Sequence, residues 1–91
     1  MSQLNPDVSI IIPTYNHAHL LSGALDSIRA QSFEGWEAIV INNFSEDETV
    51  NVVKAYDDSR IRIIDFDNRG IIAASRNYGL SKTNAPIVAF L

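Results

Sequence analysis

The chain has 91 residues, of which 46% are hydrophobic, 20% are charged and 9% are aromatic. This length holds one small domain with one hydrophobic core, and this composition excludes a disordered acidic tail. The net charge of -4 argues against a nucleic-acid or anionic-membrane surface, because binding a polyanion requires a basic face. The lack of cysteine excludes a disulfide scaffold, a zinc ribbon and a thiol nucleophile.

The sequence at the two ends of the chain predicts where the protein is located in the cell and whether the domain is complete. The first residues, MSQLNPD, are polar and lack the basic and apolar regions of a secretory signal. No apolar run approaches the roughly 20 residues that a membrane-spanning helix needs. We therefore expect a cytoplasmic protein, although a longer parent could still associate with a membrane. The chain stops inside an apolar run, so we expect residues 1–91 to be one truncated domain whose carboxyl-terminal part is missing.

Four short apolar runs alternate with three segments of helical periodicity, which predicts the element order βαβαβαβ. Pro13 ends the first run and Pro86 precedes the last. Asn16 is the expected N-cap of the first helix, and Ser45 with Glu48 forms a capping box before the second. The expected strands are residues 8–12, 36–41, 61–66 and 87–91, and the expected helices end near residues 31, 56 and 81.

This alternation indicates parallel strands joined by right-handed crossovers, and hence an α/β fold: a three-layer αβα sandwich with a parallel sheet. In such sheets ligands bind outside the carboxyl ends of the strands. Five apolar residues at helical spacing predict one buried stripe on the first helix: Leu20, Leu21, Ala24, Leu25 and Ile28.

Three site chemistries are disfavoured by the loops at these strand ends. The first loop reads PTYNHAH and lacks the glycines of a dinucleotide-binding loop. Asp7 lies at the wrong end of the first strand for the magnesium site of a phosphoacceptor domain. His17 and His19 point in different directions and have no third ligand nearby, so we expect solvated residues of a first helical turn.

Asp65 and Asp67 form an Asp-x-Asp after the third apolar run. Two carboxylates at a strand end could bridge magnesium or manganese to a diphosphate. In the alternative reading, one carboxylate caps the following turn and the other is solvated. We favour this second interpretation, because a three-letter motif in an acidic loop is a weak signal.

Four segments carry a more specific combination: SIIIPTYN (residues 9–16), WEAIVINNFSEDET (36–49), NRGIIAASRNYGLS (68–81) and APIVAFL (85–91). In this order and spacing they resemble the inverting family 2 glycosyltransferases with the GT-A fold. The likeness covers nearly the whole chain, but only the Rossmann-like nucleotide-binding half of that fold. It implies the strand order 3-2-1-4.

The resemblance also assigns residues to a nucleotide. Pro13, Thr14 and Tyr15 would line the base and ribose, with the Tyr15 ring as a stacking face. Asn16 would hold the turn, and Ser45 would belong to the second binding loop. The complete set implied by the resemblance is Pro13, Thr14, Tyr15, Asn16, Asn43, Ser45, Gly70 and Arg76.

At the end of the second strand the chain departs from the family pattern. Most relatives have two aspartates followed by Gly-Ser, and the second aspartate accepts a hydrogen bond from the nucleobase imide; here Asn42, Asn43 and Phe44 stand before Ser45. An amide accepts from a uracil or thymine N3–H while donating to a ring carbonyl, whereas the adjacent donors of guanine suit a carboxylate better. We therefore predict a UDP- or dTDP-sugar. The alternative for Asn43 is a left-handed turn residue.

The third segment matches the family's Asn-x-Gly and Ala-x-Arg-Asn-x-Gly patterns. Gly70 would allow a tight turn into the helix, and the small residues Ala73, Ala74 and Ser75 would let this helix approach the sheet closely. Arg76 would pair with the diphosphate or with an acid of the site; its alternative is a surface ion pair with the acidic loops.

In these relatives the fourth strand runs into an Asp-x-Asp that holds manganese or magnesium, but this chain ends at Leu91, where that motif would begin. The resemblance thus implies a metal for a full-length enzyme and neither a metal site nor a catalytic residue in this chain. It implies inverting transfer of a sugar to a glycan hydroxyl of unknown identity by the parent, and inactivity of the chain alone. The alternatives are a small non-catalytic module that binds a nucleotide or protein, and an inert remnant that self-associates through the unpaired edge of residues 87–91.

Overall fold

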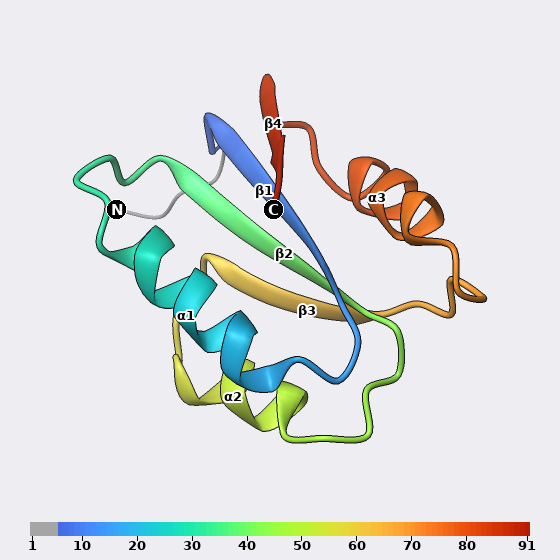
Figure 1. The fold of residues 1–91 in the computed structure, drawn as a ribbon. Coiled ribbons are helices and arrows are strands. Elements are labelled where there is room, and N and C mark those ends of the chain that lie inside the picture. Colours follow the sequence, from blue (N-terminus) through green and yellow to red (C-terminus); the bar gives the residue numbers. More distant parts are fainter. Residues whose placement is uncertain (1–5) are drawn as a thin grey trace.

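The computed structural model describes residues 6–91, which form four strands and three alternating helices (Figure 1). The strands are parallel and lie in the order β3-β2-β1-β4, which confirms the predicted topology. In chain order the elements are β1 (Val8–Thr14), α1 (Ala18–Arg29), β2 (Trp36–Asn42), α2 (Thr49–Ala55), β3 (Ile61–Asp65), α3 (Ile72–Leu80) and β4 (Ile87–Phe90).

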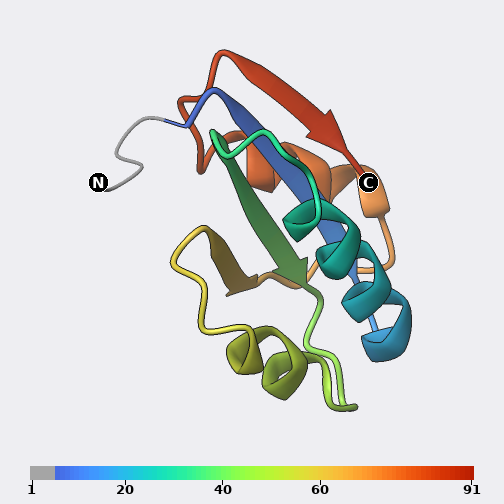
Figure 2. The ribbon, with the colours of Figure 1, turned by 90° about the vertical axis from the view of Figure 1, so that its left-hand side faces the viewer.

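The two faces of the sheet are covered by different helices (Figures 1 and 2). Successive strand residues point to opposite faces, so Ile11 and Ile12 belong to separate apolar clusters. Ile12 packs with the buried side chains of α1 and α2, whereas Ile11 packs with β2 and with Tyr78 of α3. The Tyr78 ring also stacks on Phe66, with the ring centroids 4.2 Å apart. These two clusters confirm the three-layer sandwich.

Helix α3 approaches the sheet closely where its side chains are smallest. Ser75 is fully buried. A Cβ atom added to Gly79 would lie 2.5 Å from Cγ2 of Ile11. The close approach expected at residues 73–75 is therefore made by Ser75 and Gly79, while Ala73 is exposed. The sequence could not single out Gly79, because the contact depends on which turn of α3 faces β1.

The predicted caps of α1 and α2 are wrong. Neither Asn16 nor Ser45 caps a helix: the residue before α1 is His17, the residue before α2 is Glu48, and neither makes a side-chain cap hydrogen bond. Asp47 instead accepts from the Thr49 backbone N–H at 3.0 Å. A second correction concerns Leu20, which is 59% exposed and lies outside the buried stripe of α1. No helix within residues 6–91 has the length and apolarity to cross a bilayer.

Three neighbouring strands end level with one another at the carboxyl edge of the sheet. Thr14 pairs with Asn42, and Asn42 pairs with Asp65. The ladder continues into the loops, because the Asn43 N–H donates to the Thr14 carbonyl at 3.0 Å and the Phe66 N–H to the Asn42 carbonyl at 2.9 Å. The loops after β1, β2 and β3 therefore leave the sheet side by side.

Candidate functional site

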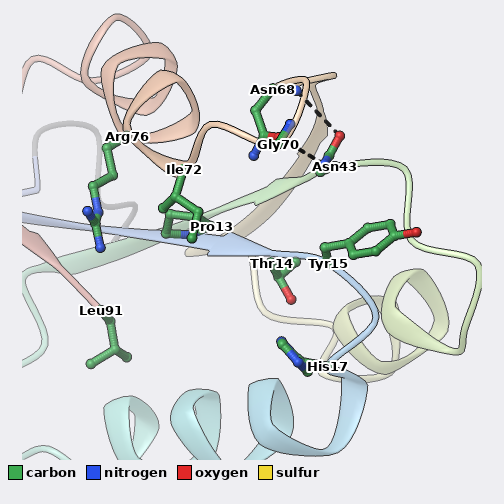
Figure 3. Close-up of a pocket in the computed structure, with 10 residues that line it drawn as sticks. All are labelled: Pro13, Thr14, Tyr15, His17, Asn43, Asn68, Gly70, Ile72, Arg76 and Leu91. Atoms are coloured by element: carbon green, nitrogen blue, oxygen red, sulfur yellow. Dashed lines mark hydrogen bonds between the residues drawn. The ribbon is translucent and has the colours of Figure 1, made fainter.

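A pocket of about 410 Å³ opens at this carboxyl edge (Figure 3). Its walls come from the loops after β1, β2 and β3, from α3 and from the end of the chain. The residues that line it are Pro13, Thr14, Tyr15, His17, Asn43, Asn68, Gly70, Ile72, Arg76 and Leu91. Its position agrees with the expectation that ligands of parallel sheets bind beyond the carboxyl ends of the strands.

The structure brings together six of the eight residues that the sequence analysis singled out. Those six are Pro13, Thr14, Tyr15, Asn43, Gly70 and Arg76. Figure 3 shows polar groups gathered at one end, where Tyr15, Asn43 and Asn68 lie, and Arg76 at the other end near Leu91. The pocket therefore combines an aromatic and amide end with a cationic end.

The other two residues, Asn16 and Ser45, do not line the pocket, and each bonds to the loop of the other. The Asn16 backbone N–H donates to Ser45 Oγ at 3.0 Å, and the Glu46 N–H donates to Asn16 Oδ1 at 2.7 Å. Asn16 has a φ of 53°, so it holds the turn after β1 as expected. Both residues join the β1–α1 loop to the β2–α2 loop, and their role in nucleotide binding stays a prediction.

Asn42 lies at the centre of the carboxyl edge and is only 1% exposed. Its Nδ2 donates to Asp65 Oδ1 at 2.9 Å, and its Oδ1 accepts from Ser45 N–H at 3.1 Å and from Ser45 Oγ at 2.6 Å. One carboxamide thus joins the ends of β2 and β3 to the β2–α2 loop. An amide suits this position because it must donate on one side and accept on the other.

Asn43, the next residue, faces the pocket and is paired with Asn68. Asn43 Nδ2 donates to Asn68 Oδ1 at 2.9 Å, and the Asn68 backbone N–H points to Asn43 Oδ1 at 3.4 Å (Figure 3). Asn68 is itself buried, and its Nδ2 donates to Ser75 Oγ at 2.8 Å. Because Ser75 belongs to α3, this pair links the β2–α2 loop to the helix that carries Arg76.

Four residues in the loops at this edge have left-handed backbone conformations: Asn16, Phe44, Arg69 and Gly70. Gly70 has a φ of 82°, which confirms the tight turn expected before α3. Phe44 has a φ of 49° and is 57% exposed, at the position where the family pattern has glycine. The left-handed residue of this loop is therefore Phe44, and the alternative reading of Asn43 as a left-handed turn residue is wrong. A bulky residue in the left-handed region of φ and ψ costs about 1–2 kcal/mol, and the surrounding hydrogen bonds must offset this cost.

Charge in and around the pocket is uneven. Within residues 6–91, Arg76 is the only lysine or arginine that lines it, and no carboxylate lies within ion-pair distance of this guanidinium. The alternative of a surface ion pair is thus not realised; the guanidinium lies 5.9 Å from the Phe90 ring centroid. Behind the pocket, Asp47 accepts hydrogen bonds from the Thr49 side chain and from the Ala18 N–H, and these lower the pKa of the Asp47 carboxyl.

The two acidic residues at the end of β3 both accept hydrogen bonds from the protein. Asp65 accepts from Asn42, and Asp67 Oδ1 accepts from the Arg69 N–H at 2.9 Å. Asp67 therefore caps its own turn, as the favoured reading had it, while Asp65 has a structural partner instead of being merely solvated. No group of three His, Asp or Glu residues within the described part of the chain is placed to hold a metal ion.

Four lining residues were not predicted: His17, Asn68, Ile72 and Leu91. Asn68 stands two residues before Gly70 in the Asn-x-Gly segment, so a motif signal for it existed. His17 was interpreted as a solvated residue, and it is exposed, but it also faces the pocket. Ile72 and Leu91 lie in the segments that resemble the family, but no role was predicted for them; the packing of α3 against β1 and β2 and the pairing of β4 with β1 place them at the pocket.

A protein-family model and several known proteins match this chain. The family model described as Glycosyl transferase family 2 matches residues 9–91. The chain belongs to glycosyl transferase family 2. One relative is the UDP-Glc:alpha-D-GlcNAc-diphosphoundecaprenol beta-1,3-glucosyltransferase WfgD of Escherichia coli, which is 34% identical over 84 residues, corresponding to 92% of this chain and 33% of that protein.

Solved structures of glycosyltransferases share the fold of this family 2 chain. The mannosyltransferase PcManGT from Pyrobaculum calidifontis, in complex with GDP-Man and Mn²⁺, matches with a TM-score of 0.80 and 29% identity, over 92% of this chain and 26% of that one. TarS from S. aureus matches with a TM-score of 0.82 and 27% identity, over 93% of this chain and 26% of that one. The family 2 chain thus spans a third or less of the length of these proteins and has the GT-A fold over that span.

Proposed function

We propose that this chain is the nucleotide-binding part of a longer family 2 glycosyltransferase and that its pocket binds the nucleotide of a UDP- or dTDP-sugar. The observation that carries the proposal is the pocket itself. It unites three loops at the carboxyl edge of the sheet and has an amide pair at one end and an unpaired guanidinium at the other.

The two ends suit the two parts of a nucleotide diphosphate. Tyr15 is 49% exposed at the amide end, and its ring is free to stack on a base. Asn43 offers both a donor and an acceptor there. Arg76 supplies a permanent positive charge for the diphosphate in a chain whose net charge is -4. One positive charge against two or more phosphate charges gives weak binding, so we expect a high dissociation constant for the isolated chain.

In the parent enzyme, an acceptor hydroxyl attacks the anomeric carbon of the sugar. A bond from this carbon to the acceptor oxygen forms as its bond to the diphosphate oxygen breaks, and the configuration inverts. The proton of the hydroxyl goes to a general base. We propose that the base, the acceptor site and the ligands for manganese or magnesium belong to a part of the parent outside these 91 residues, so the chain alone transfers no sugar. Support for the metal is the Mn²⁺ in the complex of the similar mannosyltransferase.

The test is to titrate the 91-residue chain with UDP and with GDP up to millimolar concentration and to measure binding by NMR or calorimetry. We expect UDP to bind more tightly than GDP, and Arg76→Ala to weaken UDP binding about fivefold. Arg69→Ala is the matched control, because it removes the same charge from an exposed residue that does not line the pocket. Tighter binding of GDP refutes the donor preference, and no binding of either nucleotide refutes the role of the pocket.

A second proposal concerns the exposed edge of the sheet. Within the described residues β4 pairs only with β1, and Ile87, Phe90 and Leu91 are 58%, 45% and 60% exposed. We propose that the isolated chain self-associates by pairing this edge with a second copy. In sedimentation experiments at high concentration, Phe90→Lys should lower the average mass, whereas Leu20→Lys on α1 should leave it unchanged. A wild-type chain that sediments as a monomer contradicts this proposal. The cytoplasmic location expected from the sequence stays a prediction.

A further inference from the structure

We propose that Asn68 fixes the orientation of the Asn43 carboxamide and thereby makes residue 43 selective for the edge of uracil or thymine. This inference rests on the proposed function, and it assigns to Asn68 a positioning role. Asn68 is 8% exposed, lies 25 positions from Asn43 in the chain and contacts it from the β3–α3 loop.

The orientation of Asn68 is determined by two further groups. The Gly70 backbone N–H donates to Asn68 Oδ1 at 2.8 Å, and Asn68 Nδ2 donates to Ser75 Oγ at 2.8 Å inside the protein. A hydroxyl such as that of Ser75 can both donate and accept, but a backbone N–H can only donate. The Gly70 N–H therefore requires an oxygen at this place, and Asn68 cannot rotate its amide without losing that bond.

The fixed Asn68 oxygen in turn orients Asn43. It accepts from Asn43 Nδ2 at 2.9 Å, so the nitrogen of Asn43 is turned toward it, and Asn43 Oδ1 is turned toward the Asn68 backbone N–H at 3.4 Å. A carboxamide has two N–H donors and two acceptor positions on its oxygen. After the pairing with Asn68, one N–H and one acceptor position of Asn43 remain for a ligand in the pocket.

The remaining acceptor position matches the single ring N–H of uracil or thymine. The Asn43 oxygen can accept from this ring N3–H. Guanine presents two adjacent donors, and the single acceptor position left on Asn43 can serve only one of them. A carboxylate at position 43 would suit guanine, but it would also set an oxygen against the fixed oxygen of Asn68.

Two substitutions of Asn68 separate orientation from simple packing. Asn68→Asp keeps an oxygen toward both Gly70 and Asn43, and Ser75 can rotate its hydroxyl to donate to the second oxygen. Asn68→Ala removes the oxygen altogether. The ratio of the GDP and UDP dissociation constants is the measured quantity, because a purely structural role would change both constants alike.

We expect the wild-type ratio to favour UDP, Asn68→Ala to reduce that preference about fivefold, and Asn68→Asp to keep it within about twofold. Asn77→Ala, an exposed position of α3, is the control. If Asn68→Ala fails to fold, Asn43→Asp serves instead and should shift the preference toward GDP. An unchanged preference in Asn68→Ala, or in Asn43→Asp where that variant is used, overturns the inference.

A second measurement needs no nucleotide. In the free chain, hydrogen exchange of the Asn43 side-chain amide, followed by NMR, should be slow in the wild type and in Asn68→Asp and fast in Asn68→Ala. Equal rates in all three chains overturn the assigned role of Asn68. If neither nucleotide binds, the proposed function fails while these exchange rates still decide whether Asn68 orients Asn43.

Discussion

Replacing Asn42 by aspartate tests whether the carboxyl edge depends on an amide at this position. The Asn42 carboxamide is 1% exposed and donates to Asp65 Oδ1 at 2.9 Å. In Asn42→Asp this donor becomes an oxygen, so two carboxylates meet at hydrogen-bond distance. The two hydrogen bonds accepted from Ser45 can remain, because a carboxylate still accepts them.

The magnitude follows from two effects. Losing one hydrogen bond at a buried position costs about 1 kcal/mol. Repulsion between two unit charges about 4 Å apart, as expected for the charge centres of two touching carboxylates, amounts to about 1 kcal/mol in water and about 4 kcal/mol near a protein surface, and the exposure of Asp65 favours the lower half of that range. Together they predict a loss of about 3 kcal/mol at neutral pH, which lowers the melting temperature of a domain of this size by roughly 15 °C.

The loss should depend on pH. Burial and the neighbouring carboxylate both raise the pKa of the introduced carboxyl above its unfolded value of about 3.9. The folded state then holds this proton more tightly, so stability relative to the wild type falls as the pH rises above that value and partly recovers on acidification. Thermal and urea unfolding of wild type and Asn42→Asp at pH 4 and pH 7, followed by circular dichroism, measures the effect.

A double variant provides the matched control. Asn42→Asp combined with Asp65→Asn restores one donor and one acceptor between the two positions with the roles exchanged, so it should recover most of the lost stability at pH 7. If Asn42→Asp is as stable as the wild type at pH 7, or if the double variant is no more stable than the single one, our account of the carboxyl edge is refuted. An aspartate at position 42 is compatible with this fold where the residue opposite is not an acid.

Three further predictions concern packing and titration. Gly79→Ala should destabilise the chain by about 1–2 kcal/mol, because the added methyl group overlaps β1. The control Gly23→Ala has nothing within 4 Å of the added atom and should stabilise the chain by up to about 1 kcal/mol. Equal changes in the free energy of urea unfolding would contradict the close approach of α3. Burial raises the pKa of Tyr56 to about 12, so ultraviolet titration should show one late tyrosine that Tyr56→Phe removes, and stability should fall as the pH rises from 10 toward 12. The side-chain hydrogen bonds from Arg60 lower the pKa of Asp58. Asp58→Asn should therefore destabilise the chain by about 1–2 kcal/mol at pH 7, and by less below pH 3.8, where the wild type itself loses this contribution. A stability difference between wild type and variant that is the same at both pH values would contradict the ion pair.

Local patterns determined the elements and most of the pocket. The run of β-branched residues before Pro13 predicts β1, because such residues fit a strand that is buried on both faces. The predicted end at Pro13 is wrong, because β1 continues through Pro13 to Thr14. Once parallel strands alternate with helices, their carboxyl ends must meet at one edge. For this reason the residues Pro13 to Tyr15, Asn43 and Gly70, at the strand ends and in the loops, could be placed around one pocket from the sequence and the family resemblance alone.

The tertiary structure decided which polar groups are partners. Asn16 and Ser45 read as helix caps, because the side chains of asparagine and serine commonly bond the backbone nearby. In the fold the Asn16 N–H donates to Ser45 Oγ instead, because β1 and β2 end at the same level and bring together loops that are 29 positions apart. The same holds for Asn42 with Asp65, for Asn43 with Asn68 and for Gly79 against Ile11. Each of these contacts depends on strand register and helix rotation, and a shift of one residue would remove it, so no local pattern could have specified it.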